Sequence, residues 1–137
     1  MNFNFKEFKR FEKQIILKKV GIQGQKKIKK AKILIIGMGG LGCPLLTYLA
    51  ASGIGHVGIV DSDKVEISNL NRQILFNNND LNKYKVIQAK AQVKKIYKNI
   101  KIKTFKSRLT FKNIKSILKN YEIICDGTDN YETRYLI

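Results

Sequence analysis

Cysteine is scarce in this sequence, and long apolar runs are missing from it. The two cysteines, Cys43 and Cys125, lie far apart and form neither a zinc-ligand spacing nor a disulfide framework, so we expect a reducing compartment, the cytoplasm. No apolar run is long enough to cross a bilayer, and residues 1–7 lack an apolar core of signal-peptide length. We therefore expect no membrane partner and no secretory signal.

Acidic residues are also few, with 10 against 27 lysines and arginines, which gives a formal net charge of +17. Such an excess can mark a protein that binds nucleic acid. Here the lysines are scattered along the whole chain, and lysine, asparagine and isoleucine are abundant together. We interpret this pattern as compositional drift and solvated faces, and we expect no nucleic-acid partner. Attraction to polyphosphates or to an acidic protein is compatible with the same charge.

The length of 137 residues corresponds to one domain, and its centre is a strand, a glycine turn and a helix. The apolar residues 33–36 predict a buried strand, the turn has the spacing Gly37-x-Gly39-x-x-Gly42, and a helix is expected over 45–52. In such a turn the first glycine permits the bend, the second lets the backbone approach a phosphate, and the third lets the helix pack on the strand. The free N–H groups at the start of the helix attract an anion.

A second strand is expected over 57–60, and it ends in Asp61. An acid about 20 residues past the glycines is placed to accept hydrogen bonds from a ribose. A glycine motif alone is weak evidence, but a strand before it, a helix after it and an acid at the next strand end together indicate a nucleotide site. The alternative is a glycine-rich turn with a purely structural role.

Strands and helices alternate through the rest of the chain. Asn4 and Glu7 resemble a capping box at the start of an N-terminal helix. Apolar residues recur at helical spacing on this helix, and we expect them to pack against the main domain or a second subunit: Phe5, Phe8, Phe11 and Ile15. The other expected elements are a polar connection with a short basic helix over 21–30, helices over 85–98, 111–118 and from 131, and strands over 100–105 and 121–125. They predict an α/β fold, a Rossmann-like, mostly parallel sheet with flanking helices and an N-terminal helical extension.

Polar groups follow three of the expected strands, and the carboxyl ends of parallel strands meet at one edge of a sheet. These groups are the glycine turn, then Asp61, Asp63, Asn69 and Arg72, then Asp126 and Asp129, with Lys85 opening the helix between them. Carboxylates bind Mg²⁺, and arginine and lysine neutralise phosphate oxygens. The set suits a nucleoside triphosphate better than a nicotinamide dinucleotide. For each residue alone a structural role stays open: the two aspartates 126 and 129 as helix caps, Arg72 as a partner of Asp63, and Lys85 as one surface lysine among many.

In combination and order these motifs resemble the ThiF family. Its members are the adenylyltransferases that activate sulfur-carrier proteins for molybdopterin and thiamine synthesis, and they share a fold with ubiquitin-activating enzymes. The molybdopterin branch is the most similar. The matching segments cover nearly the whole chain and are 10–17, 37–42, 61–63, 68–73, Lys85 and 126–130, followed by Thr133 and Arg134.

The resemblance implies a reaction and a set of residue roles. The C-terminal glycine carboxylate of a ubiquitin-like sulfur carrier attacks the α-phosphate of ATP, which yields a carrier acyl-adenylate and pyrophosphate. In the family the position of Asp61 holds the ribose, and that of Asp129 binds magnesium. The residues that the resemblance implies in nucleotide binding are Gly37, Gly39, Gly40, Gly42, Asp61, Asp63, Asn69, Arg72, Gln73, Lys85 and Asp129, and those implied in catalysis are Arg72, Lys85, Asp129 and Lys13.

Two departures from the family accompany the resemblance. The family usually has arginine at the position of Lys13, which reaches the phosphates of the partner subunit in a homodimer, and lysine lacks the planar fork of arginine. The family also continues for about another hundred residues beyond a Rossmann-like half of this size. We therefore expect residues 1–137 to be a C-terminally incomplete nucleotide-binding domain without the family's zinc site. The alternatives are an NAD- or FAD-dependent oxidoreductase and a non-catalytic remnant that only binds nucleotide or a partner.

Overall fold

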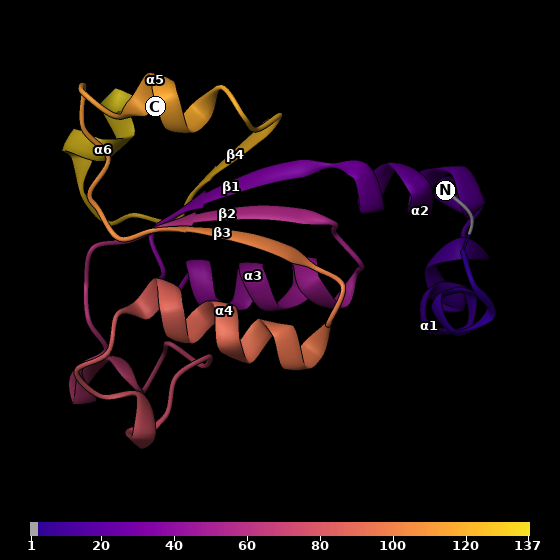
Figure 1. Ribbon diagram of the computed structural model, residues 1–137, viewed down its shortest axis with the longest axis horizontal. Helices are drawn as coiled ribbons and strands as arrows, with labels where there is room; N and C mark the ends of the chain where they lie inside the picture. Colours follow the sequence, from indigo (N-terminus) through magenta and orange to yellow (C-terminus); the bar gives the residue numbers. More distant parts are fainter. Residues whose placement is uncertain (1–2) are drawn as a thin grey trace.

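The computed structural model describes residues 3–137, in which a four-stranded sheet carries helices on both faces (Figure 1). The elements in chain order are α1 (Phe5–Ile15), α2 (Gly21–Lys30), β1 (Lys32–Ile36), α3 (Gly42–Ala51), β2 (His56–Val60), the 3₁₀ turns η1 (Ile67–Asn69) and η2 (Asn78–Asp80), α4 (Lys85–Ile96), β3 (Lys101–Phe105), α5 (Ile114–Leu118), β4 (Ile123–Asp126) and α6 (Tyr131–Leu136). Within residues 3–137 no helix combines the length and the apolar character that a membrane crossing needs.

The sheet confirms the predicted fold class. Its strand order is β3-β2-β1-β4, and every neighbouring pair is parallel. β1 lies between β2 and β4, so the four residues after Lys32 are all buried. A strand covered on both faces reads as a continuous apolar run rather than an alternating one, which is why the stretch 33–36 is recognisable in the sequence.

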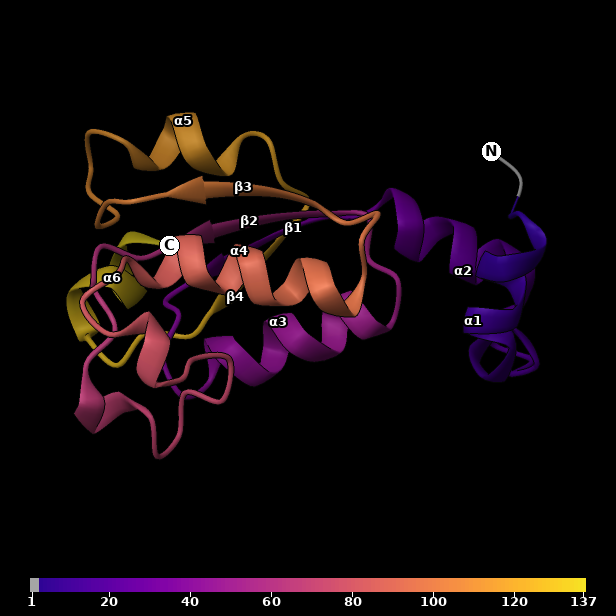
Figure 2. The same cartoon turned by 60° about the horizontal axis from the view of Figure 1, so that its bottom comes forward.

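Two hydrophobic clusters cover the two faces of the sheet. Successive side chains of a strand point to opposite faces, so Ile33 and Ile35 pack with α3 and α4, whereas Leu34 and Ile36 pack with the segment around α5. Figure 2 shows α3 and α4 together on one side of the sheet and α5 on the other. The hydrophobic cluster on the α5 side is small. On this face of the sheet the side chains change from apolar to basic toward the amino ends of the strands.

The N-terminal helices differ from the sequence expectation in two places. Of the predicted aromatic stripe only Phe11 is buried, at 1% exposure, where its ring meets that of Tyr97 edge-on, whereas Phe5 is 78% exposed. The prediction of a polar connection before the second helix is wrong, because α2 already begins at Gly21. The fully buried Gln25 donates a hydrogen bond to the Ser52 carbonyl at 2.7 Å, and this tertiary contact outweighs the poor helix propensity of the glycines.

A buried polar cluster ties α1 and α2 to the end of α4. The N-cap Asn4 accepts a hydrogen bond from the Glu7 N–H, as a capping box predicts, but the Glu7 carboxylate accepts from Lys29 Nζ at 2.6 Å instead of closing the box. Tyr97 and Asn99 also donate to this carboxylate. Burial raises the pKa of Glu7, but Lys29 and the other donors outweigh it and hold that pKa below its usual range.

Candidate functional site

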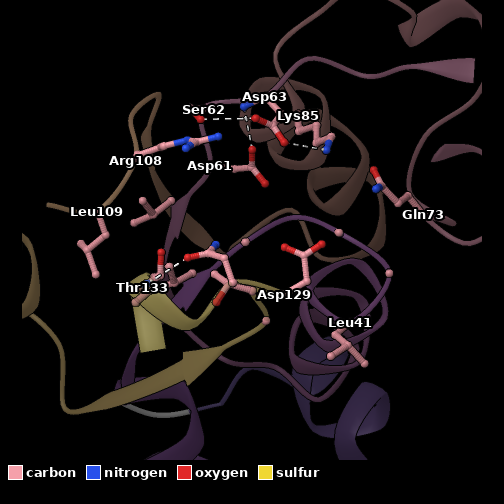
Figure 3. A pocket seen from close by; sticks show the side chains of 18 of the residues that line it. Leu41, Asp61, Ser62, Asp63, Gln73, Lys85, Arg108, Leu109, Asp129 and Thr133 are labelled. Atoms are coloured by element: carbon pink, nitrogen blue, oxygen red, sulfur yellow. Dashed lines mark hydrogen bonds and ion pairs between the residues drawn. The ribbon is translucent and has the colours of Figure 1, made fainter. Parts of the chain in front are cut away.

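A cavity of about 650 Å³ opens where the four parallel strands end (Figure 3). Its walls come from the glycine turn after β1, from the segment after β2, from residues 107–109 after β3 and from residues 127–130 after β4. The volume lies within the range of pockets that hold small ligands, and the crevice beyond the strand ends is where open α/β sheets bind them.

The glycine turn has a distinct requirement at each position. Gly37 has φ +91°, and a Cβ there would lie 2.9 Å from the carbonyl oxygen of Gly127. A Cβ on Gly42 would lie 1.9 Å from the carbonyl oxygen of Gly37, so only glycine lets α3 start here, three residues earlier than predicted. A Cβ on Gly39 would meet nothing within 4 Å, whereas a Cβ on Gly40 would lie 3.3 Å from Cγ of Arg72.

The N–H groups of the turn are available to a ligand. Within residues 3–137 no hydrogen bond is donated by the backbone of Gly39 or Gly40. Both residues line the cavity just before the start of α3. Free N–H groups and the positive end of the helix dipole make this part of the cavity attractive to an anion.

Asp61 directly follows β2 and joins two segments of the cavity wall. Its two carboxylate oxygens accept hydrogen bonds at 2.7 Å from the N–H groups of Met38 and Asp63. Burial raises the pKa of Asp61, and these two hydrogen bonds oppose the rise. Each oxygen retains a second lone pair, so the carboxylate can still accept a hydroxyl group of a ligand.

Lys85 brings a buried positive charge to the cavity. The side chain is only 7% exposed, and its Nζ lies 3.3 Å from Oδ2 of Asp63, a carboxylate that is 57% exposed. The alternative that Lys85 is an ordinary surface lysine is therefore wrong. Lys85 forms the ion pair with Asp63, so Arg72 is not the partner of this aspartate. The Arg72 guanidinium donates instead to the Ser68 carbonyl and to Asn71. A buried ammonium with one solvated partner gains from a further anion.

The acidic residues after β4 separate into two roles. Asp126 accepts hydrogen bonds from the N–H and hydroxyl groups of Thr128 and pairs with Arg134, and it does not line the cavity. The N-cap of α6 is Asn130, which accepts from the Thr133 N–H, so neither aspartate caps the helix. Asp129 lines the cavity, and no hydrogen bond to its carboxylate is found within residues 3–137.

The described residues contain no cluster of three or more histidine, cysteine, aspartate and glutamate side chains that could hold a metal ion. Magnesium is commonly held by only one or two carboxylates together with the phosphates of a substrate. The free carboxylate of Asp129 fits that form of binding.

Gln73 is the most enclosed polar side chain of the wall. It is 3% exposed, and its Oε1 is buried without a hydrogen-bond partner among residues 3–137. A buried amide oxygen left unpaired is costly, but this oxygen is enclosed by the protein and is not exposed to a ligand in the cavity.

Most of the residues that the sequence singled out meet in this cavity. Those that line it are Gly37, Gly39, Gly40, Asp61, Asp63, Asn69, Arg72, Gln73, Lys85 and Asp129. Gly42 lies behind the turn, and Lys13 lies on α1, beyond the opposite end of the sheet (Figure 1).

Sequence reasoning missed one wall, which consists of Ser107, Arg108 and Leu109 after β3, together with Glu132 and Thr133 of α6. The signal for the first three residues was present, because a third parallel strand must also end at this edge.

The ThiF family's sequence profile matches residues 11–137. The chain belongs to the ThiF family. Two curated ThiF relatives are an "Adenylyltransferase and sulfurtransferase MOCS3" of Culex quinquefasciatus, 44% identical over 98% of this chain and 31% of its own length, and a "Sulfur carrier protein adenylyltransferase" of Thermus thermophilus, 39% identical over 100% and 51%. The chain thus spans about a third to a half of these relatives.

A solved structure supports the same assignment. E. coli MccB with ATP aligns with a TM-score of 0.65 and 33% identity over 68% of this chain and 28% of that chain. The curated ThiF relatives are named adenylyltransferases, and the structural match extends the likeness from sequence to fold.

Proposed function

We propose that this chain binds ATP with Mg²⁺ at the carboxyl ends of its strands and forms the nucleotide half of a site that adenylylates a ubiquitin-like sulfur carrier. The observation that carries the proposal is Lys85, a buried ammonium in a cavity that also presents the free N–H groups of the glycine turn. Family membership and the names of the relatives support the reaction class.

The cavity has a separate place for each part of the nucleotide. In Figure 3, Lys85 and Gln73 lie on one side of Asp61, and Arg108 and Leu109 lie on the other. We assign the phosphates to the side of Lys85, where the glycine turn also presents its N–H groups. Asp61 then receives the ribose hydroxyls, and the buried Leu109 offers an apolar surface to the base.

The proposed reaction needs positioning and charge neutralisation. The carrier's terminal carboxylate attacks the α-phosphorus, the bond to the β-phosphate oxygen breaks, and pyrophosphate leaves. Arg72 and Lys85 neutralise the negative charge of the phosphates, and the turn N–H groups hold them in place.

No protein nucleophile takes part in this step. Cys43, next to the turn, is buried, and burial raises the pKa of its thiol to about 11, so it stays protonated near neutral pH. Both cysteines are free thiols, which suits the reducing cytoplasm that we propose for the protein.

ATP with Mg²⁺ should stabilise the protein against heat more than NAD does. A ligand that binds only the folded state stabilises it by about 2.7 kcal/mol at 100 times its Kd. Differential scanning fluorimetry with equal concentrations of the two nucleotides measures the difference, with MgCl₂ alone as the control. Equal or greater stabilisation by NAD would contradict ATP binding and would favour the oxidoreductase alternative.

Asp129→Asn should weaken the dependence of ATP binding on Mg²⁺ while it leaves the fold unchanged. The Asp129 carboxylate would hold Mg²⁺, which would supply positive charge beside the phosphates, and an amide lacks the charge that would hold it. Titration of ATP by calorimetry at several Mg²⁺ concentrations tests this. Asp126→Asn removes the same charge from a carboxylate of the same segment that does not line the cavity, and it is the control. A parental response to Mg²⁺ in Asp129→Asn would rule out a metal-binding role.

We also propose a homodimer in which α1 and α2 meet a second copy. This region exposes large apolar side chains, with Phe5, Ile16 and Leu17 more than half exposed. Lys13 stands on the same helix, far from the cavity of its own chain, and we propose that it reaches the nucleotide of the neighbouring copy. Light scattering should give twice the monomer mass for the parent, and Phe5→Ser with Ile16→Ser should give the monomer mass. A monomeric parent would contradict the assembly.

A further inference from the structure

A row of basic side chains crosses the sheet at the end opposite the nucleotide cavity. Lys32 of β1 is in register with His56 of β2, and His56 is in register with Lys101 of β3. Parallel neighbours in register carry their side chains on the same face, so the three groups stand side by side. His56 thus separates Lys32 from Lys101, and the charges of both lysines act on its imidazole.

The row forms one wall of a second cavity, of about 590 Å³. Two more lysines line it, Lys103 from β3 and Lys119 after α5, and Glu122 is the only acidic side chain in the lining. Within residues 3–137 none of these four lysines is ion-paired with a carboxylate. Among the described residues, four lysines therefore contribute to the lining against a single glutamate.

Tyr121, one of the residues that line this cavity, packs over a strand position that has no side chain. Gly58 follows His56 on the same face, and a Cβ there would lie 2.3 Å from the hydroxyl oxygen of Tyr121. The Tyr121 ring thus covers the strand at this point and presents its hydroxyl to the lining. The apolar side chains of this face begin only beyond it, at Leu34, Ile36 and Val60.

His56 stands in the middle of the basic row, between Lys32 and Lys101. Its Nδ1 is buried, and no hydrogen-bond partner for it is found in the described part of the chain. Burial and the neighbouring Lys101 and Lys32 lower the pKa of His56, so the imidazole is neutral near pH 7. An anion between the lysines would oppose the part of that lowering that Lys101 and Lys32 cause, and would favour the imidazolium.

We propose that this cavity binds a small anion that carries two or more phosphate groups. The lining supplies ammonium, imidazole and phenol donors, which match the acceptor oxygens of phosphates. The concave shape and the volume suit a small molecule rather than an extended polymer. The site is distinct from the nucleotide cavity, because β1 contributes Lys32 to the one and Ile36 to the other, about 13 Å apart at the rise of a parallel strand.

His56 is the single histidine of the sequence, so its imidazole resonances report on this cavity alone. The experiment is an NMR pH titration of His56 in the whole chain, with and without inorganic pyrophosphate. We expect saturating pyrophosphate to raise the pKa of His56 by about one unit. Lys101→Gln with Lys103→Gln should weaken pyrophosphate binding, as followed at His56, by about tenfold or more.

The matched control is Lys90→Gln with Lys98→Gln, which removes the same charge from exposed positions in and after α4, the helix on the other face of the sheet. It should leave the response of His56 at the parental level. Any one of three results would overturn the proposal: a His56 pKa that pyrophosphate leaves unchanged, equal weakening in the control, or tighter binding of a short oligouridylate than of pyrophosphate at this reporter. The last result would mark a nucleic-acid surface. Pyrophosphate bound only in the nucleotide cavity should leave the His56 signal unchanged, because His56 does not line that cavity, so failure here is distinguishable from failure of the proposed function.

Discussion

Gly42→Ala should lower the free energy of unfolding by about 3 kcal/mol or more. The added Cβ would lie 1.9 Å from the Gly37 carbonyl oxygen, a backbone atom that cannot rotate away. To relieve the clash, α3 must move off the end of β1, and this movement opens the packing around Met38 and Leu46, both of which are fully buried. Urea unfolding followed by circular dichroism measures the loss.

Gly39→Ala is the matched control, since the same atom added three residues earlier meets nothing within 4 Å. Its free energy of unfolding should stay within about 1 kcal/mol of the parent. Gly39 lines the nucleotide cavity, however, so the methyl group should obstruct the phosphates and weaken ATP binding. The pair thus separates the structural glycine from the one that faces the ligand. Parental stability of Gly42→Ala would show that the turn is not constrained as the structure describes.

Lys85→Met should reduce the affinity for ATP with Mg²⁺ by at least about tenfold. Methionine fills the space of the lysine stem but lacks the ammonium group that we assign to the phosphates. The protein should remain folded, because Asp63, the partner of Lys85, is more than half exposed and regains water when the ammonium is lost. Isothermal calorimetry gives the affinity, and urea unfolding checks the fold.

Lys83→Met is the control for this change. It removes the same charge two residues away, at an exposed position outside the cavity lining. If Lys85→Met and Lys83→Met bind ATP equally, the buried ammonium does not contact the nucleotide and the main support of the proposed function is lost. A loss confined to Lys85→Met would locate the phosphates beside it.

The central unit of the fold could be read from the sequence because its physical causes are local. The apolar run 33–36 has one stable place in a sheet covered on both faces, and the glycines of the turn meet steric demands of the adjacent backbone. The helix α2 could not be read in this way, because its glycines argue against a helix and the contact that stabilises it, from Gln25 to Ser52, joins residues 27 positions apart.

The same distinction applies to the candidate site. Asp61 and Lys85 were found because each stands at a recognisable boundary, the end of a strand and the start of a helix. The partner of Asp63 could not be predicted, since Arg72 was a plausible partner until the fold placed Lys85 against the aspartate. The basic row was also out of reach, because it depends on the register of three strands that the sequence does not specify.

The position of β1 in the sheet has a consequence for how the chain folds. Ile33 pairs with Val57 on one side and with Ile123 on the other, so the second partner is synthesised about ninety residues after β1 itself. Contacts between residues so far apart form late, because the entropy of closing a long loop must be overcome first. Until β4 arrives, β1 keeps an open apolar edge, which can pair with another chain. The yield of refolding should therefore depend on protein concentration, with dilute solutions favouring the native sheet over aggregates.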